Sequence, residues 1–226
     1  MATFLLIHGG GDVGWYWHLV EERLRAHGHR TFAPDLPDDD SATLDDYVDA
    51  ATAAVADHED LVIVGHSYGA YTATLAAQRL SARLLVLLAG MIPAPGESPN
   101  EWWANTGYRQ AVEEQAALDG GRTGNDDPFI SFYNGVPRPI AEEAMRRASH
   151  RGESSTVAKT PWPLPTWPSI PTRVILCEDD KFFPAPFLRR LTRSRLALTP
   201  DEVPGGHCAA LSHPAEITNL LLGYLA

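Results

Sequence analysis

The sequence predicts an α/β fold: a mainly parallel six-stranded sheet flanked by helices, with one large inserted segment. Short apolar runs alternate along the chain with segments expected to form helices, and this alternation is typical of a parallel sheet covered on both faces. A second observation is that the run Leu61–Val64 leads directly into a glycine-flanked serine turn. A third is that residues 93–168 differ in composition from the rest.

Six strands are expected in chain order, in alternation with helices. They lie near residues 3–8, 30–34, 60–65, 84–89, 172–177 and 196–203. Helices are expected between and after them, near residues 16–27, 43–57, 68–80, 184–193 and 213–225. The third helix is the best supported, because residues 70–80 are rich in good helix formers and contain no glycine or proline.

The segment 93–168 is too long for a loop between a strand and the next helix. It holds ten of the 18 prolines and four of the six tryptophans. Such a segment is usually a functional insertion, so we expect a cap, or lid, above the site, on a core formed by residues 1–92 and 169–226. Helices are expected within it at residues 101–118 and 140–150.

Ser67 is the first candidate catalytic residue. It is the central residue of G-H-S-Y-G at positions 65–69, between the strand Leu61–Val64 and the helix over residues 70–80. This G-x-S-x-G pattern exposes the serine Oγ on a tight turn, which the flanking glycines allow to close. It predicts a nucleophile that forms an acyl-serine intermediate.

An acid and a histidine follow in the order that a serine hydrolase of this kind requires. The predicted strand Thr172–Cys177 runs into Glu178, Asp179 and Asp180, three carboxylates at the sheet edge where such folds keep their sites. His207 comes after a glycine turn, from which a loop could carry the imidazole over Ser67. His207 is then the general base, and one of the carboxylates orients it.

A glycine-rich loop after the first strand supplies the third component. Thr3–Ile7 leads into His8 and three glycines, whose backbone N–H groups can point at a developing oxyanion. We expect the two donors to be the N–H groups of Gly10 and Tyr68. His8 is expected to orient this loop through hydrogen bonds.

These motifs resemble the α/β-hydrolase superfamily over the whole chain. Residues 8–17, 33–37, 65–69, 180–184 and 206–207 are similar to the branch that contains plant methyl-ester esterases, hydroxynitrile lyases and many small bacterial esterases. In that branch the acid precedes a proline by four residues, and here Pro184 selects Asp180. The resemblance therefore implies the triad Ser67, Asp180 and His207.

The same resemblance favours an esterase over related activities. Hydroxynitrile lyases of the branch carry a threonine after the first-loop histidine and a lysine after the catalytic histidine, where this chain has Gly9 and Cys208. Dehalogenases and epoxide hydrolases of the fold carry aspartate in place of Ser67. The expected reaction is hydrolysis of a small to medium, largely apolar carboxylic ester.

The expected substrate pocket combines aromatic residues of the insertion with one glycine and one methionine of the core. The predicted substrate-binding residues are Gly9, Met91, Trp102, Trp103, Phe129, Phe132, Tyr133 and Trp162. Two alternatives remain open at this stage. One is a thioesterase or lactonase on the same triad, and the other is a ligand-binding receptor with little turnover.

Composition limits the partners. The chain has 226 residues, enough for one large core, and a net charge of −11, which argues against nucleic-acid binding. No long apolar run predicts a membrane span, and the N-terminus reads as a strand without a basic leader, so we expect a cytoplasmic protein. Two cysteines suggest packing residues, and no cofactor or metal is expected. The sequence leaves the oligomeric state unknown.

Overall fold

The computed structural model describes residues 1–225 and contains one sheet of six parallel strands. The strand order is β2-β1-β3-β4-β5-β6, and every neighbouring pair is parallel. The strands are β1 (Thr3–Ile7), β2 (Arg30–Phe32), β3 (Leu61–His66), β4 (Leu84–Leu88), β5 (Thr172–Cys177) and β6 (Asp201–Val203). The predicted fold class is thus confirmed.

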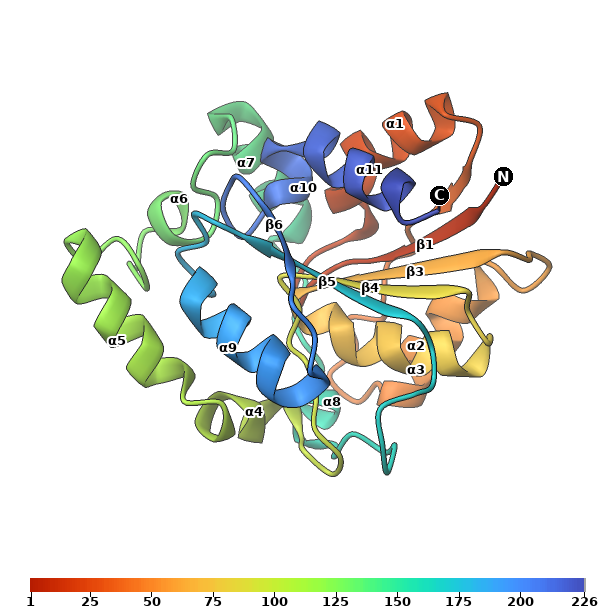
Figure 1. Ribbon diagram of the computed structural model, residues 1–226, viewed down its shortest axis with the longest axis horizontal. Helices are drawn as coiled ribbons and strands as arrows, with labels where there is room; N and C mark the ends of the chain where they lie inside the picture. Colours follow the sequence, from red (N-terminus) through yellow and green to blue (C-terminus); the bar gives the residue numbers. More distant parts are fainter. Residues whose placement is uncertain (226) are drawn as a thin grey trace.

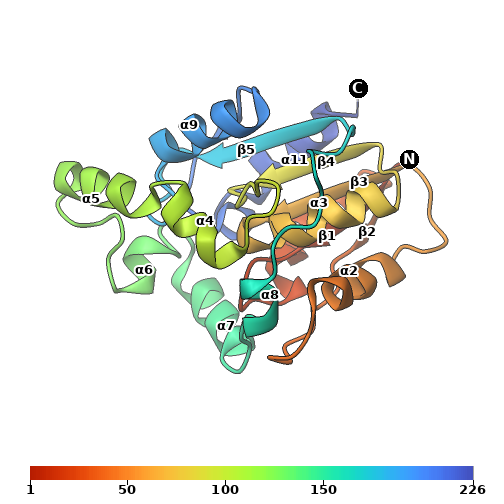
Figure 2. The same cartoon turned by 90° about the horizontal axis from the view of Figure 1, so that it is seen from below.

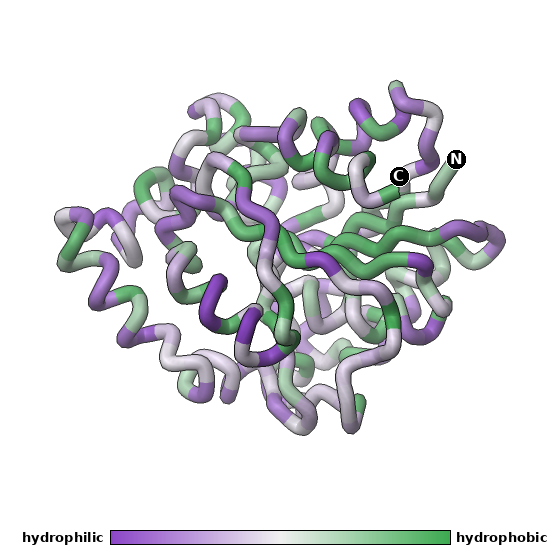
Figure 3. The backbone as a smooth tube through the Cα atoms, in the orientation of Figure 1, coloured by the Kyte–Doolittle hydropathy of each residue, from purple (hydrophilic) through white to green (hydrophobic). Residues whose placement is uncertain are grey.

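The central strands are apolar throughout because helices cover both faces of the sheet. All residues of β1, β3 and β4 are buried, and Figure 3 shows them as a continuous hydrophobic band. Helices α1 (His18–Ala26) and α11 (Pro214–Gly223) pack together on one face. Helices α2 (Leu44–Ala53) and α3 (Ala70–Arg79) pack together on the other (Figure 1).

Two further helices lie near the sheet. Helix α9 (Ala185–Leu196) packs against β5, and the short α10 (Ala209–Ser212), which follows the loop that carries His207, packs against α1 and α11. Among residues 1–225, every helix is too short or too polar to cross a membrane.

The segment between β4 and β5 folds into five helices. They are α4 (Pro99–Asn105), α5 (Tyr108–Asp119), α6 (Pro128–Ser131), α7 (Arg138–Ala148) and α8 (Ser155–Lys159). Figures 1 and 2 show α4 to α7 gathered at the end of the sheet toward which the strands point. Parallel strands place their functional residues at this end.

Three predicted elements are wrong in extent, and one of them is the helix expected at residues 43–57, which ends at Ala53. The strand expected at residues 196–203 is only Asp201–Val203, because the amphipathic α9 continues to Leu196 and ends at Ala197 in a left-handed conformation (φ +55°). The helix expected at residues 101–118 is two helices, because Gly107 adopts φ +68° between α4 and α5 and breaks the hydrogen-bonded pattern.

Candidate active site

The serine turn at the end of β3 is strained, and its glycines are required by close contacts. Ser67 adopts φ +51°, a conformation that non-glycine residues rarely occupy. A Cβ atom on Gly65 would lie 2.5 Å from the Cβ of Ala73, and one on Gly69 would lie 2.2 Å from the carbonyl oxygen of His8. The turn can therefore pack against α3 and the first loop only with glycine at both positions.

A chain of two hydrogen bonds joins the three residues expected to form the triad. His207 Nε2 lies 3.0 Å from Ser67 Oγ, and His207 Nδ1 lies 2.8 Å from Asp180 Oδ2. In the neutral imidazole, Nδ1–H donates to the carboxylate and Nε2 is left to accept the serine proton. All three side chains are buried.

The backbone fixes the orientation of the Asp180 carboxylate. Its Oδ1 accepts hydrogen bonds from the backbone N–H groups of Phe182 (2.8 Å) and Phe183 (2.7 Å), which leaves Oδ2 for the imidazole. The two competing acids, Glu178 and Asp179, are exposed. Of the three carboxylates that follow β5, the structure brings Asp180 to His207.

The imidazole of His207 is fully buried among aromatic rings. The ring centroids of Phe132, Phe182 and Phe183 lie 4.8, 4.9 and 5.0 Å from that of His207. His66 Nε2–H also donates to the carbonyl oxygen of His207 at 3.0 Å, which ties the histidine loop to the serine turn. These contacts restrict the imidazole to one orientation.

The first loop is held in place by His8. The Nδ1–H of His8 donates to the carbonyl oxygen of Gly9 (2.7 Å), and its Nε2 accepts from the backbone N–H of Leu36 (3.0 Å). Burial lowers the pKa of His8 to about 4, so the ring is neutral at physiological pH. Gly10 and Tyr68, the expected oxyanion donors, line the same cavity as Ser67.

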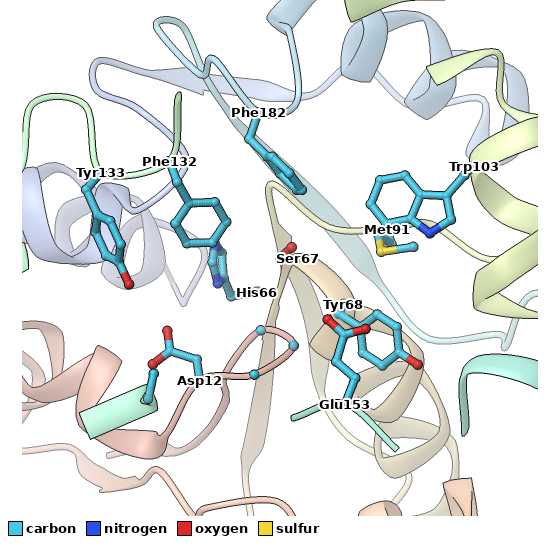
Figure 4. A pocket seen from close by; sticks show the side chains of 14 residues that line it. Asp12, His66, Ser67, Tyr68, Met91, Trp103, Phe132, Tyr133, Glu153 and Phe182 are labelled. Carbon is cyan, nitrogen blue, oxygen red and sulfur yellow. The ribbon is translucent and has the colours of Figure 1, made fainter. Parts of the chain in front are cut away.

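A cavity of about 110 Å³ opens above Ser67, several times the ~10–15 Å³ that one water molecule needs. Figure 4 shows the side chains around it. Of the eight predicted substrate-binding residues, those that line it are Gly9, Met91, Trp103, Phe132 and Tyr133. Three of these residues, Trp103, Phe132 and Tyr133, belong to the segment between β4 and β5.

Three predicted pocket residues lie elsewhere, which corrects the expectation. Trp102 is fully buried in the contact between α4 and the core, and its Nε1–H donates to the carbonyl oxygen of Ile92 at 2.9 Å. Phe129 packs under the guanidinium of Arg138, 3.7 Å from its ring centroid. Trp162 is buried with its ring centroid 5.8 Å from that of Trp167.

Sequence reasoning missed five side chains that line the cavity: Asp12, His66, Ala148, Glu153 and Phe182. Asp12 follows the glycines of the first loop, and Phe182 follows the acid, so both lie in motifs already singled out. Glu153 lies in the loop between α7 and α8, and no local pattern marks it. Its place depends on how that loop packs over the core.

Comparison with known proteins agrees with this architecture. The norfluorocurarine synthase 1 of a Strychnos species is 24% identical over 96% of this chain and 93% of its own length. Esterase PIR7B of Oryza sativa subsp. japonica is 35% identical over 42% of this chain and 40% of its own length. The crystal structure of polyneuridine aldehyde esterase superimposes with a TM-score of 0.77 and 22% identity, and covers 100% of both chains.

A family model matches most of the chain. It is described as the alpha/beta hydrolase family and matches residues 4–220, a range that includes five strands in full, β1 from Phe4 onward, the serine turn and His207. The chain therefore belongs to the alpha/beta hydrolase family.

Proposed function

We propose that this carboxylic-ester hydrolase cleaves a small to medium, largely apolar ester through an acyl-serine intermediate on Ser67. The single observation that carries the proposal is the hydrogen-bond chain from Ser67 Oγ through His207 to Asp180, with separations of 3.0 and 2.8 Å. The esterases among the relatives support the reaction class.

Ser67 attacks the ester carbonyl while His207 Nε2 takes the hydroxyl proton. The imidazolium that forms donates through Nδ1 to Asp180, which stays ionised and stabilises the positive charge. The hydrogen bonds from the backbone N–H groups of Phe182 and Phe183 to Oδ1 hold the Asp180 carboxylate in this orientation, so it does not have to rotate when the imidazolium forms.

The tetrahedral oxyanion is proposed to accept from the backbone N–H groups of Gly10 and Tyr68. Removal of one such donor typically costs about 100- to 1000-fold in rate. The intermediate then collapses, His207 returns the proton to the leaving alcohol, and the acyl group remains on Ser67. Water, activated by the same imidazole, releases the acid in the second half of the reaction.

We propose that residues 93–168 act as a cap over this site, on a core of residues 1–92 and 169–226. Trp103, Phe132 and Tyr133 of this segment line the cavity together with Met91 of the core. An aromatic wall of this kind selects substrates by the shape of the acyl or alcohol group.

Steady-state kinetics on a panel of p-nitrophenyl and methyl esters test the proposal. Ser67→Ala should lower kcat by about 10⁴-fold or more, because no other group replaces the nucleophile. Ser41→Ala is the matched control, since Ser41 is exposed and hydrogen-bonds only within its own loop. A folded Ser67→Ala protein that keeps more than a few per cent of the turnover excludes this nucleophile.

A second pair of variants tests the acid. Asp180→Asn should lower kcat by about 10⁴-fold, because the imidazole loses its orientation and charge partner. Asp179→Asn removes the same charge one residue earlier and should have a small effect, since Asp179 is exposed. The reverse order would assign the role to Asp179.

A further inference from the structure

The cavity above Ser67 contains two carboxyl groups and no lysine or arginine among its lining residues. Figure 4 shows Asp12 and Glu153 on opposite sides of Ser67. The whole chain carries a net charge of −11, so the surrounding field also favours positive ligands. A pocket for a purely apolar ester has no need of either acid.

Asp12 is a buried carboxyl without a cationic partner. Only 8% of the residue is exposed, and its Oδ1 accepts one hydrogen bond, from the N–H of Val13 at 2.8 Å. Within residues 1–225, no lysine or arginine nitrogen lies within 4.0 Å of this carboxyl. Buried carboxylates are normally paired, so this one can accept a charge from a ligand.

Glu153 approaches the first loop from the other side. A Cβ atom on Gly10 would lie 1.9 Å from Glu153 Oε1, so this carboxyl packs directly on the glycine backbone. Although the residue as a whole is exposed, burial against the cavity raises the pKa of its carboxyl. The neighbouring Arg151 does not neutralise it, because Arg151 pairs with Asp38 at 3.1 Å and donates to the carbonyl oxygen of Leu36.

His66, which also lines the cavity, presents a further hydrogen-bond acceptor. His66 Nε2–H is used by the carbonyl oxygen of His207, so the buried Nδ1 carries a lone pair, and it has no hydrogen-bond partner in the described part of the chain. This Nδ1 lies only 3.0 Å from where a Cβ of Gly9 would be. Burial holds the pKa of His66 well below its ordinary value and keeps the ring neutral.

Aromatic faces complete the environment. Trp103, Phe132 and Phe182 line the cavity, and such rings attract ammonium groups as well as alkyl groups. We propose that the preferred substrates are esters that carry one ammonium group close to the scissile bond, with Asp12 and Glu153 as its anionic partners. This inference rests on the proposed hydrolysis at Ser67.

Matched esters that differ only in charge test the inference. One pair places the charge in the alcohol: acetylcholine and the neutral acetate in which a tert-butyl group replaces trimethylammonium. The other pair places it in the acyl group: the methyl esters of trimethylammonio-butanoic acid and of its carbon isostere. Because a trimethylammonium group does not titrate, the charge of the substrate does not change with pH. The ratio of kcat/KM values within a pair does not depend on the fraction of folded enzyme.

In at least one pair, kcat/KM should be about tenfold or more higher for the cationic ester, although its neutral isostere is the more hydrophobic of the two. Asp12→Asn and Glu153→Gln should each lower that ratio by about threefold or more, as expected for loss of one partly desolvated charge. Glu59→Gln is the matched control, because it removes an equal charge at an exposed position before β3 and should leave the ratio unchanged.

The outcomes separate the two proposals. Hydrolysis of the neutral esters without a cation preference in either pair overturns the inference and leaves the ester hydrolase in place. A preference that Asp12→Asn and Glu153→Gln both leave intact also overturns it, because the charge is then recognised elsewhere. If no ester of either kind is turned over, the proposed function fails and the inference fails with it.

Discussion

At the scale of single residues, Asp12 shows how a pocket can reduce the stability of the chain that forms it. Burial raises the pKa of this carboxyl from 3.8 to about 6. The folded protein therefore binds the proton more tightly than the unfolded chain. The ionised carboxylate opposes folding most strongly above pH 6, and this cost falls as the pH decreases toward 3.8.

Asp12→Asn should accordingly stabilise the protein at pH 8, by up to about 3 kcal/mol, because the amide keeps the hydrogen bond from Val13 and removes the buried charge. The gain should shrink toward zero near pH 4. Urea unfolding of both proteins at the two pH values measures it. The buried His8, whose pKa is lowered on folding, reduces the free energy of unfolding as the pH falls over a similar range. Both proteins contain His8, so this effect cancels in the difference. An equal or lower stability of the variant at pH 8 contradicts this account of Asp12.

The residues of the candidate site differ in how well the sequence could predict them. Ser67 and His207 each follow a strand or a glycine turn with a recognisable pattern, so their chain order and spacing were informative. For the acid, the residues alone left three carboxylates open after β5, and only the resemblance selected Asp180. Glu153 has no such signal, because its approach to Gly10 depends on the packing of the whole loop after α7. Trp102, which packs on the core outside the cavity, and Trp103, which lines the cavity, are neighbours in sequence. Only the orientation of α4 determines which of them faces the cavity.

At the scale of secondary-structure elements, a buried ion pair anchors the insertion to the core. Arg195 near the end of α9 bonds both carboxylate oxygens of Glu97, and its guanidinium also donates to the carbonyl oxygen of Ile92. Glu97 accepts further bonds from the N–H of Ala94 and from Asn105, and its side chain is only 4% exposed. The ion pair therefore joins the start of the insertion to α9.

Arg195→Met should destabilise the fold by about 3 kcal/mol or more, because it leaves the Glu97 charge buried without a partner. The double variant Glu97→Gln/Arg195→Met should recover part of the loss. Thermal unfolding of the two variants and of Arg109→Met provides the comparison, since Arg109 and Glu113 form an exposed pair that contributes little. A double variant less stable than Arg195→Met alone argues against the buried charge as the cause.

The positions of the aromatic residues of α4 and α6 lead to a prediction about which chain lengths of ester the protein prefers. Trp103 lines the cavity, so Trp103→Ala should shift the ratio of kcat/KM between short- and long-chain esters, by about fourfold for each methylene that gains or loses a contact. Phe129→Ala is the matched control, because Phe129 packs under Arg138 outside the cavity. Equal ratios for wild type and Trp103→Ala would mean that this wall does not select the substrate.

The elements also show where local sequence signals end. Apolar runs predicted the interior strands because these strands are buried on both faces and tolerate little else. The extent of α9 was missed because Arg193–Leu196 fits an amphipathic helix and the start of a strand equally well. The break at Gly107 was missed because an isolated glycine within a helical stretch can be accommodated as well as end the helix.

At the scale of the whole molecule, the candidate site combines parts that are far apart in sequence. The sheet brings the loops after β1, β3, β5 and β6 to one edge (Figure 1). The segment between β4 and β5 adds aromatic side chains to the wall of the cavity. The parallel order of the strands, which the sequence predicted, is sufficient to gather the first four parts. The wall depends on tertiary packing of the insertion, so its residues were only partly predictable.

The central claim is that the structure activates Ser67 through His207. The most direct measurement is the reaction of the protein with a fluorophosphonate, followed by intact mass and peptide mapping. We expect one adduct per chain, on Ser67 Oγ, with loss of fluoride, and no adduct within the same time in His207→Ala, because the unassisted hydroxyl is a poor nucleophile. Labelling at another residue, or equal labelling of His207→Ala, would contradict the account.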